Sequence, residues 1–320
     1  MLSEGMNKFR PLLNTIAVGF LAANFLALQD VSASAQGASA QSASANPSRI
    51  LTIGRVSGNP RKHAGRLLAL GQFIVARHEG FDNVEVVLKP HPDEMVAAAL
   101  RGEIDLISET VFTALQLEKT GKMEMALLEW KDGVRAYHSQ ILVRADSDVR
   151  SLQDLRGKRI AFEDPGSTSG FFLPYVEIMN AGVDMIPEAA GKTVPGKVSY
   201  SFGGAEINVV GALIRGRVDA AVISNLDMHD DEVVPDKFVS AIRVLHATRE
   251  VPRSMMLMRA SIKPADRTQL EKLLLSLHET DPGRAILRRY FKVTKFDPID
   301  RDAQMKIDSV RRFFHERHSR

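Results

Sequence analysis

The chain contains no cysteine among its 320 residues, which excludes disulfides, cysteine-based zinc sites and thiol nucleophiles. Tryptophan occurs once, and aromatic residues make up only 6% of the sequence. The formal net charge of +3, from 42 Lys and Arg against 39 Asp and Glu, is too small to indicate a nucleic-acid partner. With 44% hydrophobic and 25% charged residues, the composition is that of a globular protein long enough for two lobes.

Sequence motifs of several enzyme classes are missing as well. There is no HExxH, no G-x-S-x-G and no Walker A motif, and Gly166–Gly170 has the wrong spacing for a nucleophile elbow. The run Met228–Asp231 is a conceivable metal patch, but beside Pro235 it is more typical of a surface loop. We therefore expect a protein that is not an enzyme, with no catalytic residue, metal or cofactor.

The amino-terminal segment holds a hydrophobic run of a kind typical of exported proteins. Lys8 and Arg10 precede the apolar stretch Leu12–Leu28, and small residues follow it. This order predicts a secretory signal peptide over residues 1–35, cleaved at its end, with an uncleaved membrane anchor as the alternative. Residues 36–48, rich in Ala and Ser, predict a flexible linker. We expect the mature protein in the periplasm.

Beyond the linker, strand-like and helix-like segments alternate in two cycles. Each cycle reads strand, helix, strand, helix, strand, which predicts parallel sheets with helices packed on their faces. The first cycle comprises Ile50–Gly58, Arg66–Ala76, Val84–Lys89, Asp93–Gly102 and Ile104–Ser108. The second comprises Lys158–Phe162, Gly170–Asn180, Val198–Gly204, Ile207–Ile214 and Asp219–Ser224.

The two cycles contain a similar short sequence segment at equivalent points. Leu100–Leu106 and Ile214–Ala220 both read as a helix end, a Gly C-cap and an Asp entering an apolar strand. We therefore predict two similarly built α/β lobes with the second inserted into the first. The expected division is residues 49–143 plus 246–320 for lobe 1 and 144–245 for lobe 2, with crossing strands at Gln140–Arg144 and about Ile242–Met258. A final helix, Asp300–Phe314, is expected to place Met305, Val310 and Phe313 in an apolar stripe.

The most informative stretch is Ile160–Pro174, IAFEDPGSTSGFFLP. A short strand ends at the turn signal Asp164-Pro165-Gly166, and three hydroxyl residues precede an apolar helix. Free N–H groups at a helix start, the positive end of its dipole and three hydroxyls favour binding of a phosphate-like oxyanion. The alternative is that Ser167 or Thr168 only caps the helix.

The block Ser151–Pro174 closely resembles the signature of phosphate, phosphite and phosphonate substrate-binding proteins of ABC importers, and the resemblance runs from about Arg49 to about Phe296. It implies a type II periplasmic-binding-protein fold, with two α/β lobes and a ligand cleft and hinge between them. It further implies that the triplet holds the phosphonate oxygens, with Tyr137 as a second ligand contact. The triplet is Ser167, Thr168 and Ser169.

The surroundings of the triplet depart from that family. The family carries Gly-Pro and an aromatic where this chain has Ser108–Phe112, and His where this chain has Glu206. Val251–Ser254 lacks the acid that pairs with a ligand amine in some members. The resemblance therefore leaves the ligand open.

Ligands of open parallel sheets lie beyond the carboxyl ends of the strands, so residues that follow the strands are candidates for the site. These are Glu109, Thr110, Glu206 and Asn225. Two carboxylates would repel an oxyanion unless ligand protons, a ligand amine or another cation lay between them, which favours a zwitterionic or protonated ligand. Alternatively, Glu109 caps the next helix or pairs with Arg61 or Lys62.

Two further sets of residues have two interpretations each. Trp130 is expected to pack in the core rather than to serve as a ligand platform. Arg61-Lys62-His63 follows a strand and either supplies positive charge to the cleft mouth or forms a solvated helix start.

We thus predict the solute-binding component of an ABC importer that captures a small phosphorus oxyanion or a phosphonate-like ligand. Its partners would be a small anionic or zwitterionic ligand and an inner-membrane permease, with no nucleic acid, and the protein would be a monomer. The alternatives are a ligand-sensing periplasmic protein that docks on a membrane receptor and a binder of a different small zwitterionic or organic solute.

Overall fold

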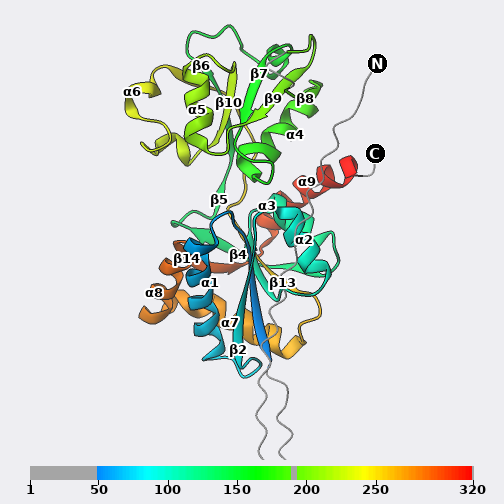
Figure 1. Ribbon diagram of the computed structural model, residues 1–320, viewed down its shortest axis with the longest axis vertical. Helices are drawn as coiled ribbons and strands as arrows, with labels where there is room; N and C mark the ends of the chain where they lie inside the picture. The colour runs from blue at the N-terminus through cyan, green and yellow to red at the C-terminus, as the bar shows by residue number, and fades with distance from the viewer. Residues whose placement is uncertain (1–48, 189–192, 319–320) are drawn as a thin grey trace, which may run out of the picture. The chain divides into compact units, whose positions relative to one another are not determined.

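The computed structural model describes residues 49–188 and 193–318 (Figure 1). The predicted signal peptide, residues 1–35, and linker, residues 36–48, lie outside the described residues. Among the described helices, none combines the length and apolar character that crossing a membrane requires.

The first six-stranded sheet combines strands from both ends of the folded chain. Its order is β14-β4-β13-β3-β1-β2, with β1 parallel to both β2 and β3, and with β13 antiparallel to β3 and β4. Figure 1 shows this sheet with the blue strands of the amino-terminal part and, at its other edge, the orange strand β14. The bounds are β1 Ile50–Val56, β2 Asn83–Lys89, β3 Leu106–Glu109, β4 Met123–Lys131, β13 Met255–Arg259 and β14 Val293–Pro298.

The second six-stranded sheet repeats this plan with the middle of the chain. Its order is β11-β6-β10-β7-β9-β8, with β7 parallel to both β9 and β10, and with β6 antiparallel to β10 and β11. The strands β9-β7-β10-β6-β11 therefore correspond to β2-β1-β3-β13-β4. The bounds are β6 Ser139–Arg144, β7 Arg159–Phe162, β8 Met185–Pro187, β9 Val198–Phe202, β10 Ala220–Ser224 and β11 Ile242–Ala247.

Helices cover both faces of each sheet, as the alternating pattern predicts. The first sheet packs against α1 on one face and α2 and α3 on the other, so that two apolar clusters lie on its two sides. The second sheet likewise separates a cluster under α4 from a cluster under α5. The bounds are α1 Pro60–Val75, α2 Pro92–Leu100, α3 Val111–Glu118, α4 Leu173–Asn180, α5 Glu206–Ile214, α6 Asp236–Val239, α7 Pro264–Ser276, α8 Asp281–Arg289 and α9 Arg301–His318.

The repeated segment, Leu100–Leu106 and Ile214–Ala220, forms the same structure in both places. The glycines that end α2 and α5 have positive φ angles of 74° and 66°, a conformation that favours glycine. Oδ2 of Asp105 then accepts the N–H of Thr52 at 2.8 Å, and Oδ2 of Asp219 accepts the N–H of Arg159 at 2.8 Å. Each Asp thus ties the start of one strand to the first strand of its own cycle.

The connection between the two sheets differs from the predicted one. β6 and β11, expected to cross between the lobes, pair with each other inside the second sheet. The crossing segments contain β5 (Ala136–Tyr137), which precedes the first predicted stretch, and β12 (Val251–Pro252), which lies within the second. These two strands form a separate antiparallel pair. Strand pairing depends on tertiary contacts, so an apolar run alone does not fix the sheet to which it belongs.

Candidate functional site

The Ser-Thr-Ser triplet lies where β7 gives way to α4. Ser167 is the N-cap residue, and its Oγ accepts the N–H of Gly170 at 2.9 Å. One turn of π-helix, Thr168–Phe172, follows before α4 begins, and such turns are frequent at functional sites. The capping role, one of the two interpretations of Ser167 left open by the sequence, is therefore present in the structure.

Thr168 joins this turn to the amino terminus of α3, a helix of the first sheet. Its Oγ1 accepts the N–H of Phe112 at 2.8 Å and donates to Oγ1 of Thr110 at 2.9 Å. The rings of Phe112 and Phe172 stack beside these bonds, with centroids 4.2 Å apart. Thr168 is only 1% exposed, so its hydroxyl is the buried acceptor for a backbone N–H.

Ser169 and Tyr137 bring the triplet to the crossing strands. The hydroxyl of Tyr137, on β5, forms hydrogen bonds with the side chains of Ser169 and Thr168, and Tyr137 is 2% exposed. Burial raises the pKa of Tyr137, while the nearby Arg253 opposes that rise. The guanidinium carbon of Arg253, which follows β12, lies 4.6 Å from the centre of the Tyr137 ring. Hydroxyl donors and a fixed cation are therefore grouped at the crossing segments.

A pair of carboxyl groups lies on the other side of the triplet. Glu163 directly follows β7, and its side chain forms hydrogen bonds with Ser167 and with Glu206, the first residue of α5. Burial, followed by the charge of Glu206, raises the pKa of Glu163 to about 8. Asp227 adds further negative charge. Glu163 is thus protonated at neutral pH, and one proton lies between the two carboxyl groups.

Glu109, at the end of β3, takes neither of the structural roles weighed from the sequence. The N-cap of α3 is Thr110, and Oε1 of Glu109 accepts the N–H of Val56 at 3.0 Å. Burial raises the pKa of Glu109, and the charges of Arg55 and Lys131 oppose that rise. The carboxyl group therefore connects β3 to β1 within a partly compensated buried charge cluster.

The rest of that cluster lies at the same edge of the first sheet. The side chain of Glu129 is fully buried, accepts a hydrogen bond from Ser108, and lies 3.5 Å from Nζ of Lys131. Burial lowers the pKa of Lys131, the carboxylate of Glu129 opposes this, and the charges of Arg55 and Arg253 lower it further. The cluster thus reaches from β1 to the residue that overlies Tyr137.

Asn225, the remaining candidate, has a structural bond in this arrangement. Its Oδ1 accepts the N–H of His138 at 2.9 Å, and its own N–H donates to the carbonyl of His138 at 2.9 Å. Asn225 therefore fixes the end of β10 to the segment between β5 and β6, directly after Tyr137.

The structure brings most of the predicted residues together and adds four. Thr110, Tyr137, Thr168 and Ser169 form one hydrogen-bonded group, and Ser167 and Glu206 meet at Glu163. Sequence reasoning missed Glu163, Arg253, Arg55 and Lys131. Glu163 and Lys131 each end or follow a strand, so the rule applied to the other candidates would have found these two.

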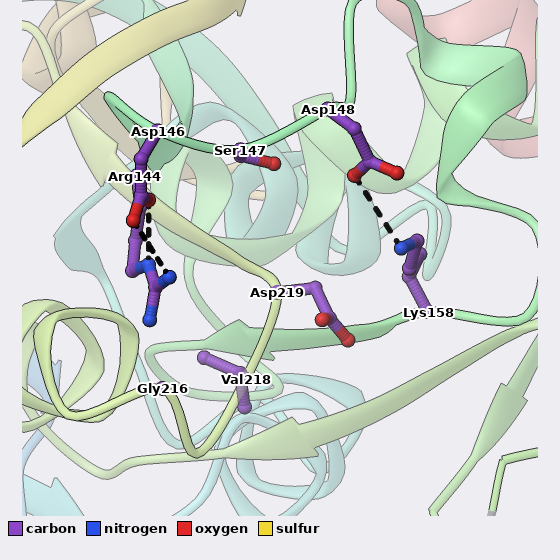
Figure 2. A pocket seen from close by; sticks show the side chains of 8 residues that line it. All are labelled: Arg144, Asp146, Ser147, Asp148, Lys158, Gly216, Val218 and Asp219. Carbon is purple, nitrogen blue, oxygen red and sulfur yellow. Dashed lines mark hydrogen bonds and ion pairs between the residues drawn. The ribbon is translucent and has the colours of Figure 1, made fainter.

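A polar cavity of about 290 Å³ lies at the opposite edge of the second sheet (Figure 2). It is lined by the ends and connections of β6, β7 and β10, and its charges are largely paired locally. Arg144 binds Asp146 at 3.0 Å, and Lys158 lies 3.6 Å from Asp148. This cavity is therefore separate from the triplet.

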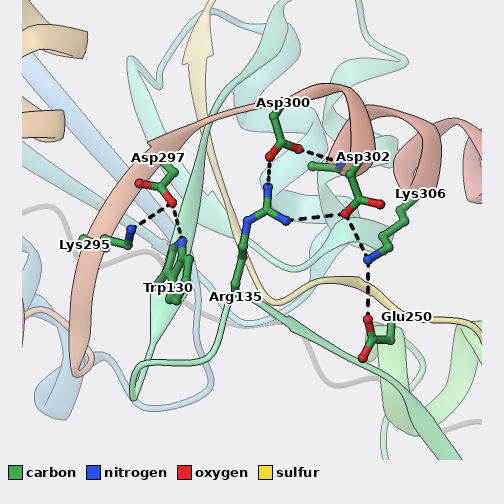
Figure 3. A network of polar contacts seen from close by, with 9 residues as sticks. Trp130, Arg135, Glu250, Lys295, Asp297, Asp300, Asp302 and Lys306 are labelled. Carbon is green, nitrogen blue, oxygen red and sulfur yellow. Dashed lines mark hydrogen bonds and ion pairs between the residues drawn. The ribbon is translucent and has the colours of Figure 1, made fainter.

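An ion-pair network holds both crossing strands to α9 (Figure 3). Arg135, just before β5, binds Asp300 at 2.5 Å and Asp302 at 3.5 Å. Lys306 lies 3.0 Å from Asp302 and 3.4 Å from Glu250, just before β12. The network thus positions the segments that carry Tyr137 and Arg253.

Trp130 belongs to the same region (Figure 3). Its Nε1 donates to Oδ2 of Asp297 at 2.9 Å, and Nζ of Lys295 lies 4.2 Å from the centre of one of its rings. The indole is thus used in contacts between β4 and β14, but Trp130 is half-buried and does not lie in the core as predicted.

Among the described residues, 49–188 and 193–318, no group of three or more His, Asp or Glu side chains is arranged to hold a metal ion. The candidate site instead consists of hydroxyls, two carboxyl groups that share a proton, and a guanidinium. Such a set suits an oxyanion that carries protons, because the carboxyl oxygens that remain free can accept hydrogen bonds from its P–OH groups.

The two sheets, with their shared 2-1-3 order of parallel strands and a fourth strand inserted antiparallel, define a type II periplasmic-binding-protein fold. XAC2383 from Xanthomonas citri has this fold with a TM-score of 0.79. In the structure bound to chloride it is 29% identical to this chain, and the match covers 83% of this chain and 98% of XAC2383. In the structure bound to ATP the identity is 28%, and the match covers 84% of this chain and 98% of XAC2383. PhnD1 from Prochlorococcus marinus, in complex with methylphosphonate, shares the fold at 15% identity, with a TM-score of 0.60 over 83% of this chain and 98% of that one.

The family model that describes the phosphonate periplasmic substrate-binding protein of ABC transporters matches residues 75–304. This chain belongs to that family, which is one of periplasmic substrate-binding proteins and not of enzymes. The phosphate-import protein PhnD of Mycolicibacterium smegmatis is 32% identical over 113 residues, 35% of this chain. The match spans 34%, about a third, of that relative's length.

Proposed function

We propose that this protein captures a small phosphorus oxyanion or a phosphonate-like ligand in the periplasm and delivers it to an ABC permease, without chemical change. The ligand oxygens would bind at Tyr137, Ser169 and Arg253. The observation that carries the proposal is the hydrogen-bonded group of Tyr137, Ser169 and Thr168, with the guanidinium of Arg253 4.6 Å from the Tyr137 ring centre.

This group has the chemistry that an oxyanion needs. Hydroxyl donors and a guanidinium form charge-assisted hydrogen bonds with phosphoryl oxygens, and such bonds are about twice as strong as neutral ones. Arg253 supplies a positive charge that would pair with an anionic ligand. The same region of the sequence lacks the acid that would pair with a ligand amine. A simple anion is therefore favoured over an aminoalkyl compound at this position.

The carboxyl pair gives the site a preference among oxyanions. Glu163 and Glu206 share a proton, so a fully ionised ligand next to them would be repelled, whereas a ligand with a P–OH group can donate to Glu206. Fully ionised sulfate has no such proton to donate. Discrimination between sulfate and hydrogen phosphate is therefore part of the proposal.

The arrangement of lobes supports capture between them. We propose that the first sheet with its helices forms one lobe, that the second sheet forms the inserted lobe, and that β5 and β12 form the hinge. The bonds of Thr168 to Phe112 and Thr110 link the two lobes directly. Closure of such lobes around a ligand is the usual mode of binding for hinged two-lobe proteins.

Relatives support a phosphorus ligand from two directions. The matched PhnD of Mycolicibacterium smegmatis is a phosphate-import protein, and XAC2383 was solved bound to ATP. The second favours a wider ligand class that includes phosphate esters. A receptor-docking sensor with the same ligand site remains the alternative function, and a zwitterionic solute the alternative ligand.

The test is a binding panel on the purified full-length protein. We expect phosphate, phosphite or methylphosphonate to raise the melting temperature, whereas sulfate at equal ionic strength leaves it unchanged. Since a ligand bound only to the native state stabilises it by RT ln(1 + [L]/Kd), about 2.7 kcal/mol at 100 Kd, a true ligand is easily detected. Binding of amines or carboxylates alone would refute the proposal.

A further inference from the structure

Two arginines of the first sheet's layer lie against a single aromatic ring. The guanidinium carbon of Arg55, near the end of β1, lies 3.7 Å from the centre of the Phe291 ring, and that of Arg66, on α1, lies 5.3 Å from it. His63 meets the same ring edge-on, with centroids 5.1 Å apart. Phe291 has a φ angle of 53° and Lys292 one of 58°, which is an uncommon conformation for non-glycine residues.

This arrangement concentrates positive charge without a direct counterion. In the part of the chain that the structure describes, no carboxylate lies within 4.0 Å of the guanidinium nitrogens of Arg55 or Arg66. Nε of Arg55 is also buried without a hydrogen-bond partner. A buried donor without a partner destabilises the protein, so an anionic partner would stabilise this group.

The pKa of His63, a neighbouring side chain, reflects the positive charge of this region. Burial lowers the pKa of His63, and the charges of Arg55, Arg66 and Lys62 lower it further. The first turn of α1 contains no acidic residue to offset the positive end of the helix dipole. A ligand anion would supply the missing negative charge.

Lys131 connects this region to the proposed ligand site. The charge of Arg55 and the charge of Arg253, the residue that lies over the Tyr137 ring, both lower the pKa of Lys131. Glu129 pairs with Lys131 at 3.5 Å and Glu109 lies in the field of Arg55, so two carboxylates offset part of the charge of the three cations Arg55, Lys131 and Arg253. Cationic groups thus extend from the Tyr137 side of the site to Phe291.

We propose that Arg55, Arg66 and Lys131 form a second anionic subsite, so that the protein binds a polyphosphate or polyphosphate ester with one phosphoryl group at Tyr137 and Ser169 and the next ones toward Phe291. This inference rests on the proposed function, because it extends the same site. It extends the proposed ligand from a single phosphorus oxyanion to a chain of phosphoryl groups.

The experiment compares orthophosphate, pyrophosphate and tripolyphosphate by calorimetric titration at matched ionic strength. Wild-type protein should bind tripolyphosphate at least tenfold more tightly than orthophosphate. Arg66→Gln should weaken tripolyphosphate binding about 10- to 100-fold, the range expected when a charged hydrogen bond is lost, and should leave orthophosphate within about twofold. Arg55→Gln should act in the same direction.

Arg77→Gln is the matched control. Arg77 lies near the other end of α1, where its guanidinium carbon is 3.7 Å from the centre of the Phe73 ring. The substitution removes the same charge and the same kind of ring contact, but at a position outside the proposed subsite. It should leave the affinities for all three compounds unchanged.

The possible outcomes separate the two proposals. If orthophosphate binds but tripolyphosphate binds no more tightly, or if R66Q and R77Q behave alike, the second subsite is refuted and the proposed function stands. If tripolyphosphate binds through Arg66 while orthophosphate and methylphosphonate do not bind, the subsite stands and the single-oxyanion ligand is refuted. If no phosphorus compound binds, both proposals fall.

Discussion

Substitution of Glu163 by Gln should remove a specific pH dependence of folding stability. In the folded protein the pKa of Glu163 is raised to about 8, from an ordinary value of 4.5, by burial and then by Glu206. The folded state therefore keeps a proton that the unfolded chain loses above pH 4.5. Because the folded pKa is the higher one, the stability from this group is complete at low pH and is lost as the pH rises toward 8.

The size of the effect follows from the proton count. While the folded state holds one more proton than the unfolded state, the free energy of unfolding falls by about 1.4 kcal/mol per pH unit. Between pH 5.5 and 7.5 this single group should cost about 2 kcal/mol of stability. Glutamine keeps the shape and the donor but cannot ionise, so E163Q should be the more stable protein at pH 7.5.

The assay is urea unfolding of both proteins at pH 5.5, 6.5 and 7.5, which cancels the contributions of all other titrating groups in the difference. The control is Glu232→Gln, a change in an exposed loop, which should follow wild type throughout. Parallel stability curves for wild type and E163Q would show that Glu163 does not retain its proton. The carboxyl pair would then lose its place in the account of ligand selection.

Four further substitutions test other contacts of the site and the fold. Thr168→Val should cost about 1 to 3 kcal/mol, because it leaves the buried N–H of Phe112 without an acceptor, whereas the cap change Ser167→Ala should cost about 1 kcal/mol; equal effects in urea unfolding would contradict this assignment. Arg253→Gln should weaken methylphosphonate binding about 10- to 100-fold in calorimetry while the melting temperature without ligand stays near wild type, and an unchanged affinity would remove Arg253 from the site. Gly283→Ala should destabilise the fold by about 1 to 3 kcal/mol, because its Cβ would lie 1.9 Å from a backbone carbonyl oxygen, and wild-type stability in thermal unfolding would show that the backbone yields easily.

The two-sheet fold could be predicted because local signals repeat. Leu100–Leu106 and Ile214–Ala220 each encode a helix end, a left-handed glycine and an Asp at the start of a strand, and both form as expected. The Asp side chain binds a backbone N–H of the first strand of its cycle, β1 or β7. The alternation of apolar strands and amphipathic helices supplied the rest. These signals lie within a few residues of one another, so the sequence exposes them directly.

Strand partners and buried faces were less accessible to sequence reasoning. Apolar content marked β6 and β11 as strands but could not reveal that they pair inside the second sheet. In α9, the predicted stripe began at Met305, which is 57% exposed, whereas Ile307 and Phe314 are buried. A helix in which several faces carry apolar residues is oriented by its neighbours and not by its own periodicity.

The candidate site shows the same division. The triplet and Tyr137 came from a motif and its resemblance, and the structure groups them. Arg253 reached the site only through the pairing of β5 with β12, which depends on the arrangement of the whole chain. The proton shared by Glu163 and Glu206 likewise required two strand-end residues from different βα units to meet.

The central claim is that the hydroxyls of Tyr137 and Ser169, together with Arg253, bind a phosphorus oxyanion. Its most direct test is calorimetric titration of the full-length protein with methylphosphonate and phosphate, with sulfate as the matched anion. We predict saturable binding of the phosphorus compounds, no binding of sulfate, and loss of binding in the double variant Tyr137→Phe, Ser169→Ala. Absence of binding by every phosphorus compound, or full binding by the double variant, would contradict the account.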